Sequence, residues 1–246
     1  MFKKTAITTV LALASLSASA DWYVQPKVGY ESRDYEISFG EGFDPATATI
    51  PGLVVGISLI NSSGWYADFE VSTGDDEVSN FYLEDDYIER DDFTLSTGWS
   101  LGNGLTLFTG FTGADTTIEN QKDQATAGYN EVKFRSEGFF GGLAKTFSFN
   151  KSHSLSVSAA IGVMEGSYQL NDARDGSGNI DVEGDSTGYS ANVAYSYRPG
   201  NSLTFTVGVK GQAYTYTDMQ DLNTGAFYVD TEETLTNVFA KTSYTF

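Results

Sequence analysis

Charged side chains recur at the polar positions of several segments in which polar and apolar residues alternate. They are Lys27, Asp68, Glu70, Lys210 and Lys241, with Arg135 and Glu137 as further candidates. Because the side chains of a β-strand point alternately to its two faces, each of these residues shares a face with other polar groups. Charges inside a narrow fold are costly unless they are paired or hydrated. We therefore predict that they neutralise one another or line an aqueous path and set its selectivity.

Acidic residues dominate the segments between the alternating stretches. The chain has 33 Asp and Glu residues against 14 Lys and Arg, a formal net charge of −19, and most acidic residues fall in five inter-segment regions. This charge disfavours nucleic acid as a partner, because nucleic-acid binding depends on Lys and Arg. Two interpretations stay open. The charge keeps the loops soluble, or the loops attract cationic solutes and loosely bind Ca²⁺ or Mg²⁺, directly or as bridges to lipopolysaccharide phosphates.

One acidic loop contains a weak candidate for a metal site. The run from Asp175 to Asp181 resembles the middle of an EF-hand-type calcium loop, and these two aspartates are its candidate ligands. The run departs from that pattern where affinity is decided, because Ala173 stands at the first ligand position and Gly184 at the twelfth. The chain has no cysteine, so no thiolate metal site is available. We predict no tightly bound cofactor.

Ten segments show the period-2 alternation that is typical of β-strands with two different faces. They are 22–30, 52–60, 65–73, 92–101, 105–113, about 132–149, 154–168, 188–198, 203–216 and 237–246. The C-terminal segment shows it most clearly, because Val238, Ala240, Tyr244 and Phe246 share one face. The faces of the glycine-rich sixth segment stay unassigned.

The connections between these segments alternate strictly between short and long. Short turns fall near 61–64, 102–104, 150–153 and 199–202, and long connections cover about 31–51, 74–91, 114–131, 169–187 and 217–233. Aromatic residues lie where segments meet short turns: Trp22, Trp65, Trp99, Phe147, Tyr195, Phe205, Tyr244 and Phe246. This layout predicts a closed antiparallel transmembrane β-barrel of ten strands, with eight or twelve as alternatives and a soluble β-sandwich as the competing fold.

The N-terminus is typical of a secretory signal peptide. Lys3 and Lys4 precede a short apolar run that ends at Ala18-Ser19-Ala20, a small-residue cleavage site. We predict cleavage after Ala20, export through the periplasm and two parts to the chain: a signal peptide at 1–20 and a barrel domain at 21–246.

The chain resembles a small Gram-negative outer-membrane β-barrel protein. In that class the final strand with its terminal aromatic residue is the signal read by the barrel assembly machinery, which implies this role for Tyr244 and Phe246. The number of strands is similar to that of the omptin proteases, but those enzymes pair acidic residues with a histidine on the extracellular side. The single histidine here, His153, falls in a predicted periplasmic turn, so we predict that the chain is not an enzyme.

These observations lead to two hypotheses about function in the outer membrane, among lipid and lipopolysaccharide. The first is a porin-like barrel that gives narrow passage to small solutes or cations, because ten strands lie near the number at which side chains fill the interior. The second is a closed-lumen structural or surface-interaction barrel that acts through its acidic extracellular loops.

Overall fold

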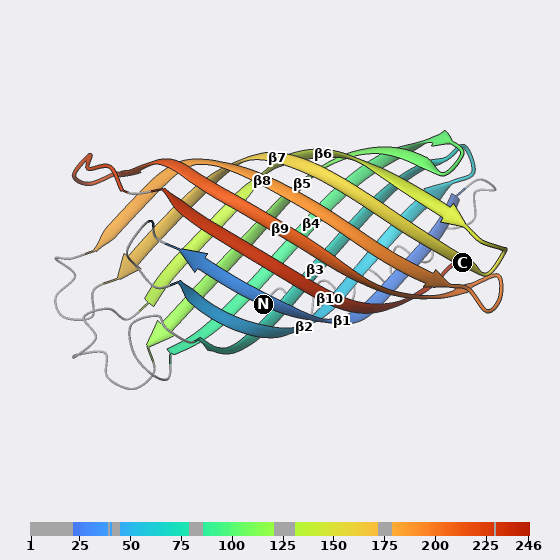
Figure 1. Cartoon of the computed structure of the whole chain (residues 1–246), viewed down its shortest axis with the longest axis horizontal. Helices are drawn as coiled ribbons and strands as arrows, with labels where there is room; N and C mark the ends of the chain where they lie inside the picture. Colours follow the sequence, from blue (N-terminus) through green and yellow to red (C-terminus); the bar gives the residue numbers. More distant parts are fainter. Residues whose placement is uncertain are drawn as a thin grey trace.

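The computed structural model describes residues 22–38, 40, 45–78, 86–120, 131–171, 179–228 and 230–246, and the predicted signal peptide lies outside them. Ten antiparallel strands form one closed barrel (Figure 1), as the sequence predicts. The strands are β1 (Trp22–Ser38), β2 (Ala46–Asn61), β3 (Trp65–Val78), β4 (Asp86–Gly102), β5 (Leu105–Asn120), β6 (Glu131–Ser148), β7 (His153–Asn171), β8 (Ile180–Tyr197), β9 (Leu203–Asp221) and β10 (Thr231–Tyr244). Within the described part of the chain, no helix is long and apolar enough to span a membrane.

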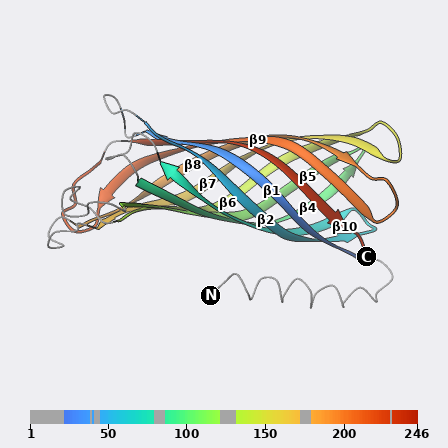
Figure 2. The same ribbon diagram turned by 90° about the horizontal axis from the view of Figure 1, so that it is seen from below.

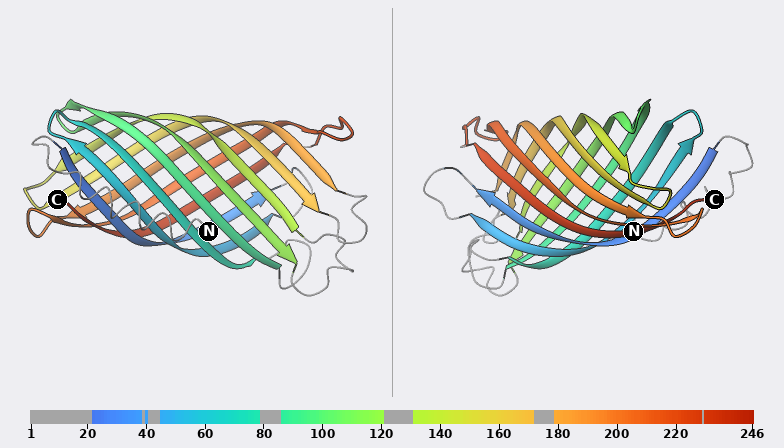
Figure 3. Two further views of the ribbon diagram at one scale, coloured as in Figure 1. Left: turned by 180° about the vertical axis from the view of Figure 1, so that it is seen from behind. Right: turned by 45° about the vertical axis from the view of Figure 1, so that its right-hand side comes forward.

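The barrel closes because β1 pairs with β10 as well as with β2. The seam runs from Lys27 opposite Ser243 to Ser38 opposite Glu232. The amide of Phe246 donates to the carbonyl of Val24 at 3.0 Å, so hydrogen bonds continue to the last residue. The C-terminus lies at the end of the barrel that carries the short turns (Figure 2), and the strands are strongly tilted (Figure 3). No strand edge between β1 and β10 is left unpaired, which is the condition for spanning lipid with strands.

Each strand contains 14 to 19 residues, whereas about 9–11 tilted residues suffice to cross a bilayer. The predicted strands were therefore too short, and the predicted long connections contain strand as well as loop. For example, β1 continues to Ser38 and β2 begins at Ala46, both within the connection predicted at 31–51. Strands of this length leave several residues of each strand beyond the span that a bilayer requires, and the long connections lie at the end of the barrel opposite the short turns (Figure 1).

An apolar belt surrounds the half of the barrel nearer the short turns. Its exposed side chains include Val28, Tyr30, Leu53, Leu95, Leu107, Phe139, Leu143, Ile161, Val163, Tyr189, Val193, Val207, Val209 and Val238. Phe139 and Val163 are 71% and 73% exposed although they lie opposite each other in the β6–β7 ladder. Such a continuous exposed apolar surface is stable against lipid and not against water. The predicted aromatic girdle, from Trp22 to Phe246, lies at its lower margin.

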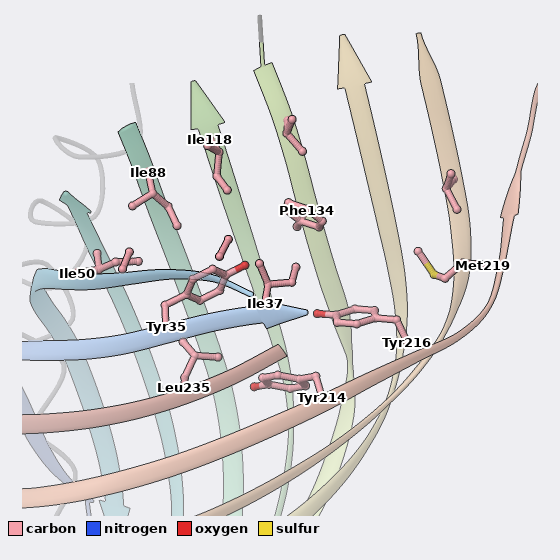
Figure 4. Close-up of a cluster of buried hydrophobic side chains, with 14 of the residues drawn as sticks. Tyr35, Ile37, Ile50, Ile88, Ile118, Phe134, Tyr214, Tyr216, Met219 and Leu235 are labelled. Atoms are coloured by element: carbon pink, nitrogen blue, oxygen red, sulfur yellow. The ribbon is translucent and has the colours of Figure 1, made fainter. Parts of the chain in front are cut away.

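The two faces of the wall exchange polarity above the belt. On β1, Val28 and Tyr30 point outward. Further along the same strand, the acidic residues Asp34 and Glu36 occupy this outward face. The inward face of the same extension is apolar and buried, and its side chains form a cluster inside the barrel (Figure 4). This apolar core consists of Tyr35, Ile37, Ala46, Ala48, Ile50, Ile88, Ile118, Val132, Phe134, Met164, Val182, Tyr214, Tyr216, Met219 and Leu235. The extracellular half is thus built like a soluble β-barrel and the other half like a membrane barrel.

Candidate functional site

A cluster of four charged side chains lies in the lumen at the level of the apolar belt. Lys27 Nζ lies 2.7 Å from Asp68 Oδ1 and 3.2 Å from Glu70 Oε2, and Lys241 Nζ lies 2.5 Å from Glu70 Oε1. The Ser58 hydroxyl also donates to Asp68. These side chains, 16% to 26% exposed, come from β1, β3 and β10. Four of the five charged residues that we predicted to line the lumen therefore pair with one another.

A second group of charged residues lies nearer the extracellular end, and its side chains are almost fully buried except that of Asp92, which is 28% exposed. Arg33 is 2% exposed, and its Nε donates to Glu31 Oε1 at 2.8 Å while its Nη1 donates to Asp92 Oδ2 at 2.6 Å. The amide of Asn237 donates to the other oxygen of Glu31 at 2.5 Å. Three strands, β1, β4 and β10, are thereby linked through their interior side chains.

Arg90 is the centre of this dry network. Its guanidinium lies 3.1 Å from Asp92 Oδ1, donates to Thr116 at 2.8 Å and contacts Glu233, and it is 1% exposed. Tyr216 donates its hydroxyl proton to the second oxygen of Glu233 at 2.5 Å. Removing charges from water is repaid only when their hydrogen bonds are satisfied in this way. The apolar core therefore rests on a polar layer that is itself closely packed.

Sequence reasoning missed this dry layer. It counted Glu31, Asp92 and Glu233 with the carboxylates of the long connections and their rims, whereas the structure places all three in the lumen. The signal lies in the period-2 pattern beyond Tyr30, where Glu31, Arg33, Tyr35 and Ile37 continue one parity. We read the charged residues as the start of a loop because the outward face had also become polar.

The lumen below the apolar core carries balanced charge. Among the described inward side chains there, equal numbers are cationic and acidic: Lys27, Arg33, Arg90, Lys210 and Lys241 against Glu31, Asp68, Glu70, Asp92 and Glu233. A cavity of about 370 Å³ lies between the two clusters. Lys210, the fifth predicted lumen residue, lines it and forms no ion pair with any described residue.

The outer wall above the belt is strongly acidic. Exposed carboxylates on the strands include Asp34, Glu36, Asp75, Glu77, Glu89, Asp91, Asp115, Glu119, Glu165, Glu183, Asp185, Asp218 and Glu232. Arg135 and Glu137, considered as lumen candidates, belong to this outer wall, where Arg135 contacts Glu137 at 2.8 Å and Asp115 at 3.6 Å. We call this surface the acidic wall.

Of the two predicted metal ligands, the structure describes only Asp181. Asp175 lies outside the described residues. Asp181 begins the outer face of β8 and accepts a hydrogen bond from Gln169 at 3.2 Å. Among the residues that the structure describes, no group of three His, Asp or Glu side chains is arranged to hold a metal ion.

The C-terminal aromatic residues lie at the lower margin of the belt. Tyr244 and Phe246 are 45% and 55% exposed, and their ring centroids are 4.8 Å apart. Trp22 of β1 packs edge-on against Trp65 of β3 across the end of β2, with the ring centroids 5.1 Å apart. An exposed aromatic pair at the barrel seam is accessible to a partner that approaches from the periplasm.

Neither protein-family models nor curated protein sequences match this chain. Several solved structures do. The outer membrane protease OmpT from Escherichia coli matches with a TM-score of 0.62 and 13% identity, over 93% of this chain and 98% of that chain. The attachment invasion locus protein Ail of Yersinia pestis has a TM-score of 0.40 and 11% identity, over 92% and 99% of the two chains. Neisserial surface protein A has a TM-score of 0.39 and 13% identity, over 92% and 97%.

The chain therefore has the fold of Gram-negative outer-membrane β-barrels. Its apolar belt contacts the lipid of the outer membrane, which is the predicted location.

The prediction that the chain is not an enzyme is wrong, because catalysis is not excluded for this fold. It rested on the absence of an extracellular histidine, and His153 is the first residue of β7, directly after a short turn, with its Nδ1 2.5 Å from the Tyr195 hydroxyl. Yet the fold is shared with an outer membrane protease over nearly the whole of both chains. This architecture thus supports catalysis in another protein. At 13% identity the likeness concerns the fold, and it assigns no reaction to these residues.

Proposed function

We propose that this protein is a closed-lumen outer-membrane barrel that binds cationic partners through its acidic wall. The observation that carries the proposal is the apolar core. Ile37, Ile50, Ile88 and Ile118 have no exposed surface, although they come from four strands around the barrel. A pore at this level requires a continuous path of hydrated side chains, and the burial of these residues supports a closed lumen.

The acidic wall supports a surface role because it is maintained at a cost in stability. Carboxylates lie directly opposite one another across neighbouring strands, as at Asp91–Asp115, Glu137–Glu165 and Glu165–Asp185. Like charges in directly opposed positions destabilise a sheet. Features that break a local stability rule commonly mark functional sites. The wall also produces a negative potential that attracts cationic ligands from solution.

The position of the wall suggests which cations it meets first. The row formed by Glu137, Glu165 and Asp185 follows directly above Phe139 and Val163 of the belt. This is the level of the lipid headgroups, so we propose that Ca²⁺ or Mg²⁺ gathers loosely there and bridges the wall to lipopolysaccharide phosphates. Above this level, the wall is free to attract basic peptides or proteins. For assembly, we propose that Tyr244 and Phe246 are read by the barrel assembly machinery.

An oligolysine peptide tests the surface role directly. We expect it to bind the folded barrel in detergent micelles, with an affinity that falls steeply as salt increases. The double variant Glu165→Gln, Asp185→Asn should bind it more weakly. The matched control is Asp68→Asn, Glu70→Gln, which removes the same formal charge from the lumen; heat-modifiable gel mobility verifies that each variant is folded. Equal weakening in both variants would show that net charge, and not the wall, attracts the peptide.

Porin-like passage of small solutes or cations is the second candidate, and the lumen cavity favours it. The cavity of about 370 Å³ is lined by polar and charged side chains such as Ser156, Ser190 and Lys210. Passage requires the apolar core above it to move aside. Liposome swelling in small sugars distinguishes the two candidates, because a closed lumen gives swelling no faster than liposomes without protein.

A further inference from the structure

Four neighbouring strands present a row of incompletely bonded polar groups to the lumen cavity. Asn192 lies opposite Lys210, Lys210 opposite Asn237, and Asn237 opposite Arg33, on strands β8, β9, β10 and β1. All four side chains line the cavity. Directly opposed residues of a sheet lie close enough for their side chains to act together. We call these residues the lumen row.

The unmet hydrogen-bonding capacity of the lumen row is of two kinds. The carbonyl oxygens of Asn192 and Asn237 accept no hydrogen bond, and Arg33 Nη2 donates none. Lys210 forms no ion pair with a described residue. The orientation of Asn237 is fixed, because its amide nitrogen donates to the Glu31 carboxylate, which only accepts. Asn237 is 8% exposed, so leaving its oxygen without a partner is costly.

We propose that the lumen row binds a small zwitterion of the amino-acid class. A carboxylate accepts from Lys210 and from Arg33 Nη2, while an ammonium group donates to the oxygens of Asn192 and Asn237. The row therefore offers cationic donors and neutral acceptors side by side, which is the complement of a zwitterion.

The charge balance of the lumen favours a ligand with no net charge. The interior already contains equal numbers of cationic and acidic side chains, so a bare anion would face the carboxylates of Glu70 and Asp92 without compensation. A zwitterion leaves the balance at zero. The cavity of about 370 Å³ is also large enough for a molecule of this size, since a water molecule occupies about 30 Å³ of liquid.

The ligand reaches the cavity from the periplasmic end. The apolar core closes the other end, whereas the lower lumen beside β7 and β8 is lined by small residues such as Ser156, Ser158, Ala160 and Ser190. The bulky charged residues of the lower cluster lie on β1, β3 and β10, away from this wall. The entrance that we propose for the ligand therefore lies at the periplasmic end of the barrel.

Glycine binding to the folded chain in micelles tests the proposal. We expect saturable binding by calorimetry, with shifts of the Asn192 and Asn237 side-chain amide signals in NMR spectra and none at Asn103, which lies in the turn after β4. Acetate lacks the ammonium group and trimethylglycine lacks N–H donors, so both should bind at least about tenfold more weakly, since a hydrogen bond to a charged group contributes that much or more.

Lys210→Met should weaken glycine binding by a similar factor, whereas Lys133→Met on the acidic wall should leave it unchanged. If Lys210→Met does not fold, the shifts of the Asn192 and Asn237 amide signals in the natural chain still test the proposal. The proposal is overturned if glycine does not saturate, if acetate binds equally well, or if ethylene glycol gives the same shifts, because the row would then hold water or any polar molecule. These outcomes leave the closed lumen and the acidic wall untouched.

Discussion

Replacing Arg90 with methionine should destabilise the barrel more than any single surface change. Arg90 is 1% exposed and contacts Asp92, Thr116 and Glu233, and its guanidinium carbon also lies 5.5 Å from the centre of the Tyr35 ring. Methionine retains the apolar stem but removes the charge. The Glu233 carboxylate then stays fully buried and the Asp92 carboxylate partly buried, each with fewer partners.

The expected cost follows from burial. Removing one partner of a buried ion pair leaves an uncompensated charge and costs about 3–5 kcal/mol. Arg135→Met is the matched control, because Arg135 also contacts two carboxylates but is 57% exposed. An exposed ion pair contributes about 0–1 kcal/mol. The two arginines thus differ chiefly in their access to water. The difference between the two losses in free energy of unfolding therefore reports how strongly water is excluded around Arg90.

Urea-dependent unfolding in micelles, followed by tryptophan fluorescence and gel mobility, gives both free energies. We expect the unfolding midpoint of Arg90→Met to fall sharply and that of Arg135→Met to change little. Adding Glu233→Met to Arg90→Met should recover part of the loss, because the orphaned carboxylate is removed and the Met side chains fill the space. Equal losses of free energy of unfolding for Arg90→Met and Arg135→Met would contradict this expectation, because Arg90 would then be hydrated.

Three further changes test other parts of the structure. Ile118→Ala should lower the free energy of unfolding by about 2–5 kcal/mol, because it opens a cavity in the apolar core; a change below about 1 kcal/mol would mean that the core is loosely packed. Glu165→Gln should raise the urea midpoint at low salt, since Glu165 lies opposite both Glu137 and Asp185, and this gain should vanish at high salt. Phe246→Ser should reduce the amount of folded barrel in the outer membrane of cells but not refolding of the purified chain in detergent, whereas Phe149→Ser should do neither; equal losses in cells and in detergent would argue against an assembly signal.

The membrane-spanning half of the barrel could be predicted from the sequence because its pattern is simple. Along β10, Val238, Ala240 and Tyr244 share the outward face and Thr242 is its one polar member, whereas the inward face from Asn237 to Ser243 is polar apart from Phe239. The short turns have equally local signals. Gly64 has a φ of +90° and Asn103 a φ of 51°, conformations that glycine and asparagine adopt at low cost.

The extracellular half could not be predicted in the same way, because alternation alone does not say which parity faces inward. On β4, Ile88 and Arg90 point into the lumen while Glu89 and Asp91 point to water, which is the reverse of the pattern at Phe93 and Leu95. Only the partners across the barrel, brought together by closure, decide that Arg90 meets Glu233 more than a hundred residues away. The lumen row depends on the same closure, since Asn237 and Arg33 become neighbours only at the seam.

The central claim is that the apolar core closes the lumen, and single-channel recording in planar bilayers tests it most directly. We expect the natural chain, refolded and inserted at both polarities, to give no discrete conductance steps. A variant in which Ile50, Ile88 and Ile118 are shortened to alanine serves as the positive control and should give steps if it inserts. Reproducible steps from the natural chain, altered by Lys210→Gln or Glu70→Gln, would contradict the claim and establish porin-like passage instead.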